Sequence, residues 1–475
     1  MKNLLTVIAV CFLQITFAQL DHRWSEKFDF DTDNEQDVKF ILTDNYNHYL
    51  FSASNSYGLV GNNSVKIRKF DQTSQLLDTY TYNFPKIDNN TGTLHNYLGS
   101  FELDVNRFVF VTESYFGKSK KKEVHYHLFD KTTSQFTTTL IGSYPIESNM
   151  KSGTTVFAVS ENKGYFGVSY QQHSVRKEPN TNYITVVDSK SLNVAWKKEA
   201  TFSDNYYERA FTVTNSGKAI LLRGANGFKL HNYLVEVSSQ EQRKLELSEE
   251  IQLHSPKAIS IGEEEYLIDF NHKTKGVRAG DYDQFLLYDL KKGTIVKNNP
   301  IKIYNSVKNV KEVVFRKINI QNDEIHIFTE CKYQSGTVAK KTNPMSTTAF
   351  NEPLYGYGYG HLIVLSFNGE IKQVKTLTTP QNTQSRPELF HSYGLLNIQG
   401  NYCIKIDSGV SKINLDKNDE VIYTQRNISK DPYIYETNFV NQLSFYTSDS
   451  KRLIIARVKD NKMSLISIFN FPDKN

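Results

Sequence analysis

The chain is poor in cysteine, proline and long apolar runs, and each shortage excludes a class of protein. It holds 3 cysteines in 475 residues, so the disulfide framework that stabilises small secreted scaffolds is excluded. Proline numbers 11, too few for a proline-rich or collagen-like chain. Beyond the N-terminus no apolar stretch approaches the roughly 20 residues needed to span a bilayer. We therefore expect no transmembrane segment in the mature chain.

An excess of charge of one sign is also missing. Lys and Arg number 56 against 51 Asp and Glu, a formal net charge of +5. A nucleic-acid binder concentrates more positive charge than this, so we expect no nucleic-acid partner. The sequence contains no Gly-x-Ser-x-Gly, Gly-x-Gly-x-x-Gly or Walker motif, the patterns typical of serine hydrolases and nucleotide-binding loops. We therefore expect no cofactor.

The first 18 residues have the pattern of a cleaved export signal. Lys2 supplies the positive charge, residues 4–17 are mostly apolar, and Thr16-Phe17-Ala18 places small residues at positions −3 and −1 before Gln19. Removing Lys2 lowers the formal net charge from +5 to +4. Cys11 lies inside the apolar stretch, so no lipoprotein anchor is expected. We predict a signal peptide at residues 1–18 and an exported mature protein, periplasmic or extracellular.

The mature chain keeps two cysteines, Cys331 and Cys403. They could form one disulfide, and the sequence does not decide whether they do. One bridge would not make a disulfide scaffold.

Strand signals fill the rest of the chain. Tyr and Phe number 29 and 30, which favours β-structure, and apolar segments alternate with period two between turn residues. A strand followed by a small polar residue and a second strand recurs at spacings of 59, 58, 50, 51, 79 and 48 residues. Its turn residues are Asp71, Asp130, Asp188, Ser238, Asp289, Asn368 and Asp416. With a further hairpin before each, every unit of about fifty residues carries four strands, as a propeller blade does.

Seven such units fit between residues 38 and 424, and a last segment supplies three more strands, at 443–446, 453–458 and 464–469. Its missing fourth strand could come from residues 24–30, which would close the propeller and leave no exposed edge. We predict an all-β fold, one β-propeller domain over residues 19–475 with about eight, alternatively seven, four-stranded blades. Two unrelated β-sandwiches are the alternative. The alternation of apolar and charged residues at 65–70 predicts an outer strand that faces water.

The chain resembles uncharacterised secreted β-propeller proteins of Gram-negative Bacteroidota in its export signal, its high content of aromatic residues and the regular spacing of its hairpins. The named repeat signatures are absent, and the fragment Asp188-Ser-Lys-Ser-Leu-Asn-Val-Ala-Trp196 is similar to quinoprotein-like blades once only. The resemblance implies an architecture and brings no catalytic residues.

Candidate site residues come from blade geometry. Loops between the second and third strands of a blade share one face with the loops between blades, and loops on a rigid scaffold usually carry function. Segments 94–97, 206–209 and 386–391 are predicted between blades. His173 with Arg176, segment 272–283 and a long insertion at 331–360 are predicted within them. The candidate ligand-binding residues on this face are Tyr206, Tyr207, Glu208, Arg209, Arg278, Asp281, Tyr355, Tyr357, Tyr359, His361, Arg386, Glu388 and His391.

Two of these segments allow opposite interpretations. Tyr355-Gly-Tyr-Gly-Tyr-Gly-His361 could present aromatic faces for stacking on sugars or on a partner's side chains, or the glycines could permit a packed structural plug. The charges at 206–209 and 386–391 could contact a ligand, or Glu and Arg could pair within each loop. Both interpretations of each segment remain open.

Metal-binding patterns are incomplete. Residues 29–35 alternate oxygen ligands but lack the glycine and the final glutamate of a calcium loop. His125 and His127 share a strand face without a third ligand nearby in sequence. We expect no metal site.

The sequence therefore predicts a binding or assembly module of the cell envelope that recognises a protein or a polysaccharide through the loop-rich face. The alternative is a glycan-active enzyme, a hydrolase or lyase, with its active site in the central funnel. Such an enzyme needs two carboxylates at a defined separation, and the sequence offers no means of choosing the pair. It also does not specify the oligomeric state.

Overall fold

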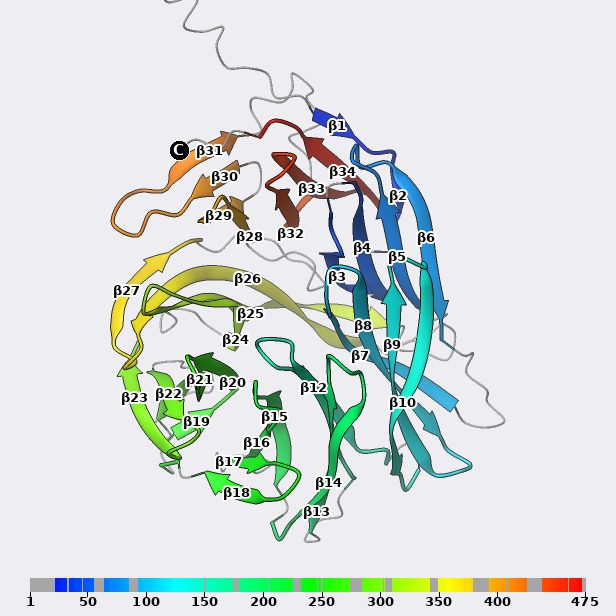
Figure 1. The fold of residues 1–475 in the computed structure, drawn as a ribbon, viewed down its shortest axis with the longest axis vertical. Helices are drawn as coiled ribbons and strands as arrows, with labels where there is room; N and C mark the ends of the chain where they lie inside the picture. The colour runs from blue at the N-terminus through cyan, green and yellow to red at the C-terminus, as the bar shows by residue number, and fades with distance from the viewer. Residues whose placement is uncertain are drawn as a thin grey trace, which may run out of the picture. The chain divides into compact units, whose positions relative to one another are not determined.

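A computed structural model gives the structure of residues 22–471. Its described residues exclude these internal segments: 32–33, 45, 55–63, 85–92, 149–150, 174–178, 205, 225–231, 246, 249–250, 274–283, 302, 304–309, 342–348, 379–392, 407–408, 425–437 and 460. The predicted signal peptide lies outside the described residues. Within them every regular element is a β-strand (Figure 1), and no helix long and apolar enough to cross a membrane is present.

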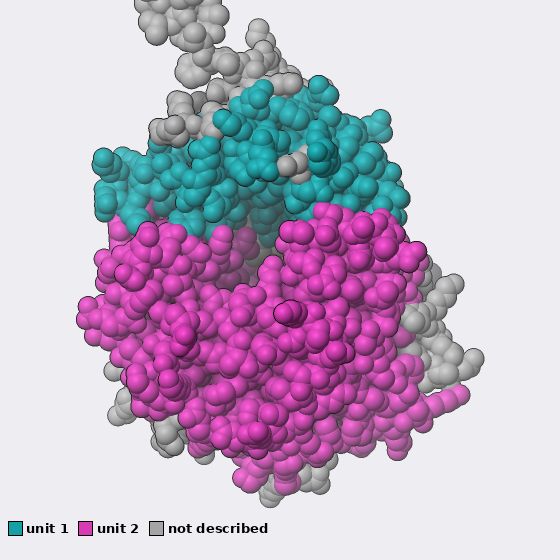
Figure 2. Space-filling view, viewed as in Figure 1, with its two compact units in different colours: residues 1–52, 66–80, 387–475 teal, residues 53–65, 81–386 magenta. Residues whose placement is uncertain are grey.

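The strands belong to two compact units. Unit 1 comprises residues 1–52, 66–80 and 387–475, and unit 2 comprises residues 53–65 and 81–386 (Figure 2). Each unit is built from antiparallel sheets. The strands of each sheet follow one another in sequence order, except in the last sheet of unit 1, which the N-terminal strands complete.

Unit 2 contains five sheets. The first three are β7 (Thr93–Glu102), β8 (Arg107–Phe116), β9 (Lys121–Asp130) and β10 (Gln135–Pro145); β11 (Thr154–Val159), β12 (Tyr165–Gln171), β13 (Asn180–Asp188) and β14 (Val194–Phe202); and β15 (Tyr207–Val213), β16 (Ala219–Gly224), β17 (Asn232–Val237) and β18 (Gln242–Leu245). The fourth is β19 (Ile251–Leu253) and β20 (Lys257–Ile261), which share one edge, then β21 (Glu264–Lys273), β22 (Gln284–Asp289) and β23 (Thr294–Pro300). The fifth is β24 (Val310–Gln321), β25 (Glu324–Lys341), β26 (Ala349–Ser366) and β27 (Ile371–Thr376).

Unit 1 holds two sheets and most of a third. The first is β28 (Gly394–Ile398), β29 (Asn401–Ile406), β30 (Gly409–Lys412) and β31 (Glu420–Thr424). The second is β32 (Asn438–Thr447), β33 (Arg452–Lys459) and β34 (Lys462–Ile468), completed by β1 (His22–Trp24) and β2 (Phe28–Asp29). The third is β3 (Glu35–Ile41), β4 (His48–Ser54), β5 (Ser64–Phe70) and β6 (Leu76–Asn83).

The N-terminal segment supplies the fourth strand of the last sheet, as the sequence predicts. His22 pairs with Ile468 and Trp24 with Ile466, and Phe28 pairs with Met463 further along the same strand. The unpaired edge of β34 is thereby covered, which removes a template for aggregation.

Eight sheets, each with four strand positions, make the fold a β-propeller. In two of them a pair of short strands, β1 with β2 and β19 with β20, shares one edge position. The predicted fold class and the count of eight are confirmed. The alternatives, seven blades or two β-sandwiches, are wrong because each fifty-residue unit forms its own four-stranded sheet.

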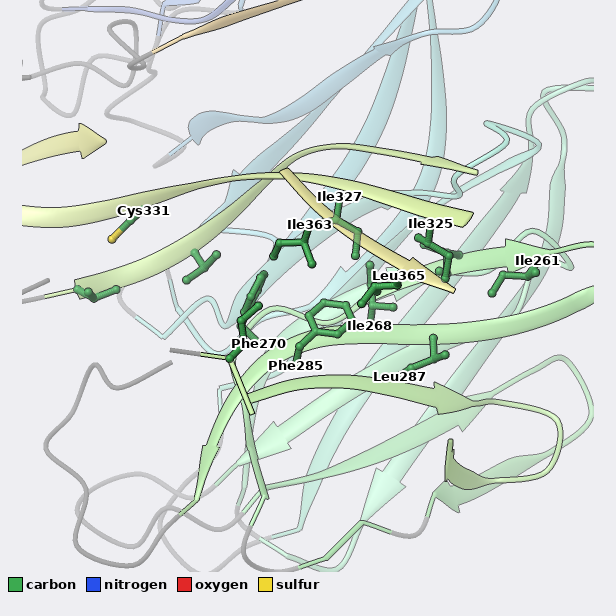
Figure 3. Packing of buried hydrophobic residues seen from close by; sticks show 14 residues of the cluster. Ile261, Ile268, Phe270, Phe285, Leu287, Ile325, Ile327, Cys331, Ile363 and Leu365 are labelled. Carbon is green, nitrogen blue, oxygen red and sulfur yellow. The ribbon is translucent and has the colours of Figure 1, made fainter. Parts of the chain in front are cut away.

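Neighbouring blades of unit 2 pack face to face through aliphatic and aromatic side chains. Ile268 and Phe270 from β21 with Phe285 and Leu287 from β22 form one side of such a core, and Ile325, Ile327, Ile363 and Leu365 from β25 and β26 form the other (Figure 3). Inner strands are therefore buried on both sides, which explains why their apolar residues are consecutive rather than alternating.

The predicted water-facing strand at 65–70 is wrong. It forms most of β5, the third strand of its sheet, and the edge is the more exposed β6. Of its three charged residues, Arg68 is 3% exposed and makes two bonds to Glu35, of 2.8 and 2.9 Å. The charge of Arg68 thus belongs to a buried ion pair and not to a solvated edge.

Candidate functional site

The candidate segment 206–209 begins the first strand of a blade. Tyr207, Glu208 and Arg209 belong to β15, and Tyr206 directly precedes it, so the prediction of a loop is wrong for three of the four residues. Segment 94–97 likewise lies in β7. The strand begins at residue 207 because this residue already pairs with Gly224 of β16.

Glu208 turns its carboxyl group toward the neighbouring blade. Its Oε2 accepts hydrogen bonds from the Ser169 hydroxyl of β12 and from the Asn182 amide of β13. Its backbone N–H donates to Gln171 Oε1 at 2.8 Å. The residue as a whole is half-buried, but Oε1 is shielded from solvent and accepts no hydrogen bond within the described part of the chain. Pairing of Glu208 with an arginine of its own segment, one of the two interpretations left open, is therefore replaced by neutral partners from the adjacent sheet.

Arg223 of β16 links the same groups to a second carboxylate. It is fully buried, and Nη1 donates to Asn182 Oδ1 at 2.9 Å. Nη2 donates to Asp204 Oδ1 at 3.1 Å and to the Tyr206 carbonyl at 2.7 Å, while Nε donates to the Tyr233 hydroxyl at 3.1 Å. Each nitrogen of this buried guanidinium therefore has an acceptor.

The backbone at Tyr206 is held by three side chains. Its carbonyl accepts from Gln171 at 3.2 Å, from Asn180 at 2.7 Å and from Arg223 at 2.7 Å. Gln171 bonds in both directions, since its carbonyl oxygen also accepts from the N–H of Glu208. The start of β15 is thus fixed against the preceding blade by polar contacts that a free loop would lack.

Tyr207 and Arg209 lie over a glycine. The register of β15 shifts between residues 208 and 210, which makes Arg209 a bulged residue. A side chain added at Gly224 would collide with Nε and Cδ of Arg209, so Arg209 occupies the space that Gly224 leaves empty. Tyr207, directly opposite Gly224, projects from the same sheet face and is 39% exposed.

The two carboxyl groups of this network have opposite pKa shifts. Burial raises the pKa of Glu208 from 4.5 to about 8, and the bonds from Ser169 and Asn182 and the charge of Arg223 offset only part of that effect. Burial also opposes ionisation of Asp204, but hydrogen bonds from Tyr233, the Tyr206 N–H and Arg223 outweigh it and lower that pKa. Near neutral pH the network therefore holds one protonated and one ionised carboxyl group.

Substituting Glu208 with Gln is expected to remove a pH-dependent loss of stability. Above about pH 4.5 Glu208 ionises in the unfolded chain but stays protonated in the folded one until about pH 8, so folding loses stability as the pH rises through this window. Gln does not ionise. The unfolding free energy of the Glu208→Gln variant relative to the natural protein should rise by about 2 kcal/mol or more between about pH 5 and pH 8.

Urea unfolding at a series of pH values measures this difference. The control, Glu263→Gln, removes an exposed carboxylate from a turn. A difference that stays constant with pH for Glu208→Gln would contradict the raised pKa.

The predicted insertion at 331–360 is a long hairpin and not a loop. β25 and β26 continue the second and third strands of their blade, with Tyr333 opposite Gly356 and Lys332 opposite Tyr357. A side chain at Gly356 would lie 2.8 Å from Tyr333 Cζ, so this glycine makes room for an aromatic ring within a strand. The Tyr-Gly alternation fits the two-residue period of a β-strand, so the segment can continue the strand in place of forming a loop.

The aromatic residues of that hairpin differ in accessibility. Tyr357 and His361 are buried, at 3% and 4% exposure, and burial lowers the pKa of His361 to about 4. Tyr359 is half-buried, with its ring centroid 6.4 Å from that of Tyr333. The side chain of Tyr355 lies outside the described residues.

Five further candidates, and one neighbour of His173, lie outside the described residues. They are Arg278, Asp281, Arg386, Glu388 and His391, with Arg176. Their assignment to the site stays a prediction.

The histidines at 125 and 127 are close in space, with ring centroids 6.4 Å apart. Both ring nitrogens of His127 lie within hydrogen-bond distance of threonines, Thr112 at 2.8 Å and Thr138 at 2.9 Å. No group of three potential metal ligands occurs in the described ranges. Cys331 and Cys403 are both buried and free, so the disulfide left open by the sequence is not formed.

Sequence reasoning missed the strand residues that complete the network, Ser169, Asn182 and Arg223. A usable signal exists: the second strand of several blades is an apolar run that ends near a charged residue. Glu113, Arg223, Asp269, Glu330 and Lys405 occupy such positions, and each is at most 4% exposed. A charge at the end of a buried strand indicates a polar network at that end of the blade.

A polar groove lies in unit 2 at the ends of the strands that are farthest from the network of Glu208 and Arg223. Its volume is about 620 Å³, and turns of three consecutive blades form it. Its charged residues are largely paired: Glu236 contacts Lys218 at 3.3 Å and Arg243 at 3.2 Å, and Lys291 contacts Glu264 at 2.8 Å. These ion pairs satisfy five of the charged side chains of the lining internally.

No protein-family model and no curated protein sequence matches the chain. Among solved structures, the β-propeller domain of the Trilobed protease from Pyrococcus furiosus is 10% identical with a TM-score of 0.39, over 84% of this chain and 98% of that one. Pyrococcus horikoshii acylaminoacyl peptidase is 10% identical with a TM-score of 0.37, over 90% and 59%. Trypanosoma rangeli sialidase in complex with sialic acid is 9% identical with a TM-score of 0.34, over 94% and 91%.

These similarities concern propeller architecture alone. At such identities and TM-scores neither peptidase nor sialidase activity follows for this chain. The resemblance to secreted propellers of Bacteroidota stays a prediction.

Proposed function

We propose that the protein is an exported binding or assembly module of the cell envelope that recognises a protein or a polysaccharide through the face carrying Tyr207 and Arg209. The export signal at residues 1–18 supports the compartment. Binding at this face would use an aromatic residue and an arginine, the side chains that most often dominate binding energy at interfaces.

The observation that carries the proposal is that hydrogen bonds hold the backbone next to these side chains in a fixed position. The carbonyl of Tyr206 accepts three side-chain hydrogen bonds and the N–H of Glu208 donates another. A backbone fixed before binding loses little conformational entropy when a partner docks, so more of the contact energy becomes affinity. Tyr207 is nevertheless 39% exposed, so its ring is accessible to a partner.

A photo-crosslinking amino acid placed at position 207 tests the proposal in envelope fractions of the organism that encodes the protein. We expect one dominant adduct, or retention on one polysaccharide of a glycan array, which Arg209→Ala weakens about tenfold or more. Gly224→Ala should weaken the same binding by displacing Arg209.

Tyr46 provides the control position, since it is 71% exposed and lies in unit 1. A crosslinker at 46 should give no such adduct, and Tyr46→Ala should leave retention unchanged. If both positions capture the same molecules, or if Arg209→Ala binds as well as the natural protein, the face is not the binding surface.

A glycan-active enzyme is the second candidate, favoured by one observation. Glu208 and Asp204 belong to one hydrogen-bonded network, and their pKa values move apart, as those of an acid and its ionised partner do in glycosidases. Release of reducing sugar from envelope polysaccharides, abolished in Glu208→Gln, would establish this activity in place of simple binding. Retention of a polysaccharide without its cleavage would support binding.

A further inference from the structure

A small cleft lies between the first two blades of unit 2, on strands β10, β13 and β14. Its volume is about 210 Å³, below the roughly 300 Å³ at which pockets for drug-sized ligands begin. It therefore fits one ring-sized group. The lining residues are Gly142, Ser143, Tyr144, Tyr183, Ile184, Thr185, Lys197, Lys198 and Glu199.

One wall of the cleft belongs to a stack of three tyrosines. The ring centroid of Tyr170 lies 5.9 Å from that of Tyr183 and 5.1 Å from that of Tyr144, both pairs stacked. Tyr144 and Tyr183 are 5.7 Å apart. Tyr170 is fully buried, whereas Tyr183 is half-buried and reaches the cleft. The stack thus places one supported aromatic ring at the cleft surface.

Polar contacts fix the stack from behind. The Tyr170 hydroxyl donates to the Pro145 carbonyl at 2.8 Å, and the hydroxyls of Tyr144 and Thr185 lie 2.9 Å apart. The ammonium group of the fully buried Lys122 lies 4.6 Å from the Tyr170 ring centroid. Because Tyr170 cannot shift without breaking these contacts, Tyr183 is held in place before any ligand arrives.

The cleft face of β14 carries one charge of each sign, Lys197 and Glu199. Lys197 and Lys198 are adjacent in β14, and neither has an ion-pair partner among the residues that the structure describes. Lys197 lies opposite Thr185, the residue whose hydroxyl meets Tyr144 on the cleft side, so its side chain projects from that same face. Glu199 lies opposite Tyr183 on this same face, and burial and the charge of Glu199 raise the pKa of Tyr183. Lys198 lies opposite Ile184 and projects from the other face, so Lys197 is the cation that faces the cleft.

We propose that this cleft binds a single anionic saccharide residue, a uronate or a sulfated hexose, stacked on Tyr183 with its acidic group on Lys197. A pyranose ring presents C–H groups that pack on the negative face of an aromatic ring. A lysine without an intramolecular partner is available for a charge-assisted bond to a carboxylate or sulfate. The cleft is separate from the face that carries Tyr207, so the test of this site is independent of the test of the proposed function.

Isothermal titration of the full mature chain tests the site with four probes. Trigalacturonate and a carrageenan-derived sulfated tetrasaccharide carry the acidic groups, and maltotriose and neoagarotetraose are their neutral controls. We expect saturable binding of at least one acidic probe, weakened by added salt, and at least tenfold weaker binding of the neutral ones. The acidic probe that binds identifies carboxylate or sulfate as the recognised group.

Variants separate the cleft from general surface charge. Lys197→Gln should weaken acidic binding about tenfold, whereas Lys190→Gln, on a turn of the same blade, should not change it. Tyr183→Leu should weaken binding similarly, and Tyr183→Phe should retain it because the ring remains. If Tyr183→Leu fails to fold, the other variants carry the test. Equal binding of acidic and neutral sugars, no saturable binding, or Lys197→Gln matching Lys190→Gln would overturn the proposal.

Discussion

Substituting Arg223 with Leu is expected to lower the free energy of unfolding by about 3–5 kcal/mol, the usual cost of removing one partner from a buried charged network. The guanidinium is fully buried and donates to Asn182, Asp204, Tyr206 and Tyr233. Leucine removes four hydrogen bonds at once and leaves Asp204, which keeps bonds from Tyr233 and the Tyr206 N–H, without its cationic partner. A buried polar group that loses its donor retains its desolvation cost.

Two variants make this result specific. Arg223→Lys keeps the charge but lacks the planar fork that reaches several acceptors at once, so most of the loss should remain. Arg209→Leu, on the more exposed neighbouring strand, should cost less than about 1 kcal/mol. Urea unfolding followed by tyrosine and tryptophan fluorescence measures all three. A loss for Arg223→Leu no larger than that for Arg209→Leu would show that the network is not structural.

The blades could be predicted because their signal is local. Each hairpin is encoded by a few alternating residues and a turn, so the sequence from Asp71 to Asp416 shows the repeat without any long-range information. The strand that completes the last sheet was also accessible, since three strands without a fourth leave an edge that another segment has to cover.

The candidate network could not be predicted because its partners are distant in sequence. Glu208 is 39 residues from Ser169 and 26 from Asn182, and no local pattern connects them. The same limitation explains the error at Arg68, where a charge in an alternating strand is an interior ion pair with Glu35, 33 residues away. Alternation shows which side chains share a sheet face, but which face meets water depends on the neighbouring blade.

The loop prediction for the Tyr-Gly segment is wrong for a different reason. Glycine between aromatics favours a turn or loop on local grounds, yet Gly356 lies in a strand where the ring of Tyr333 needs the space. A cross-strand packing requirement, invisible in the local sequence, decides the conformation.

Deleting residues 19–30 is expected to lower the free energy of unfolding by more than Arg223→Leu does. Phe28 and Phe30 belong to a core cluster of unit 1 with Val458, Met463 and Leu465, and replacing one such buried phenylalanine with alanine typically costs about 3–5 kcal/mol. The deletion removes both, together with the backbone pairing of β1 and β2 to β34. It also exposes the edge of β34, so the shortened chain should aggregate as well as unfold at lower urea concentration.

A synthetic peptide of residues 19–30 distinguishes loss of this strand from general damage. Added in excess to the 31–475 chain, it should restore the unfolding midpoint in a concentration-dependent manner, because a ligand that binds only the folded state stabilises it by mass action. A peptide with Phe28 and Phe30 both replaced by alanine should restore little, since it retains the backbone donors but not the apolar contacts. If the 31–475 chain is as stable as the 19–475 chain, the N-terminal strand is not required for closing the last blade. If both peptides rescue equally, main-chain pairing to β34 and not burial of the two phenylalanines supplies the stabilisation.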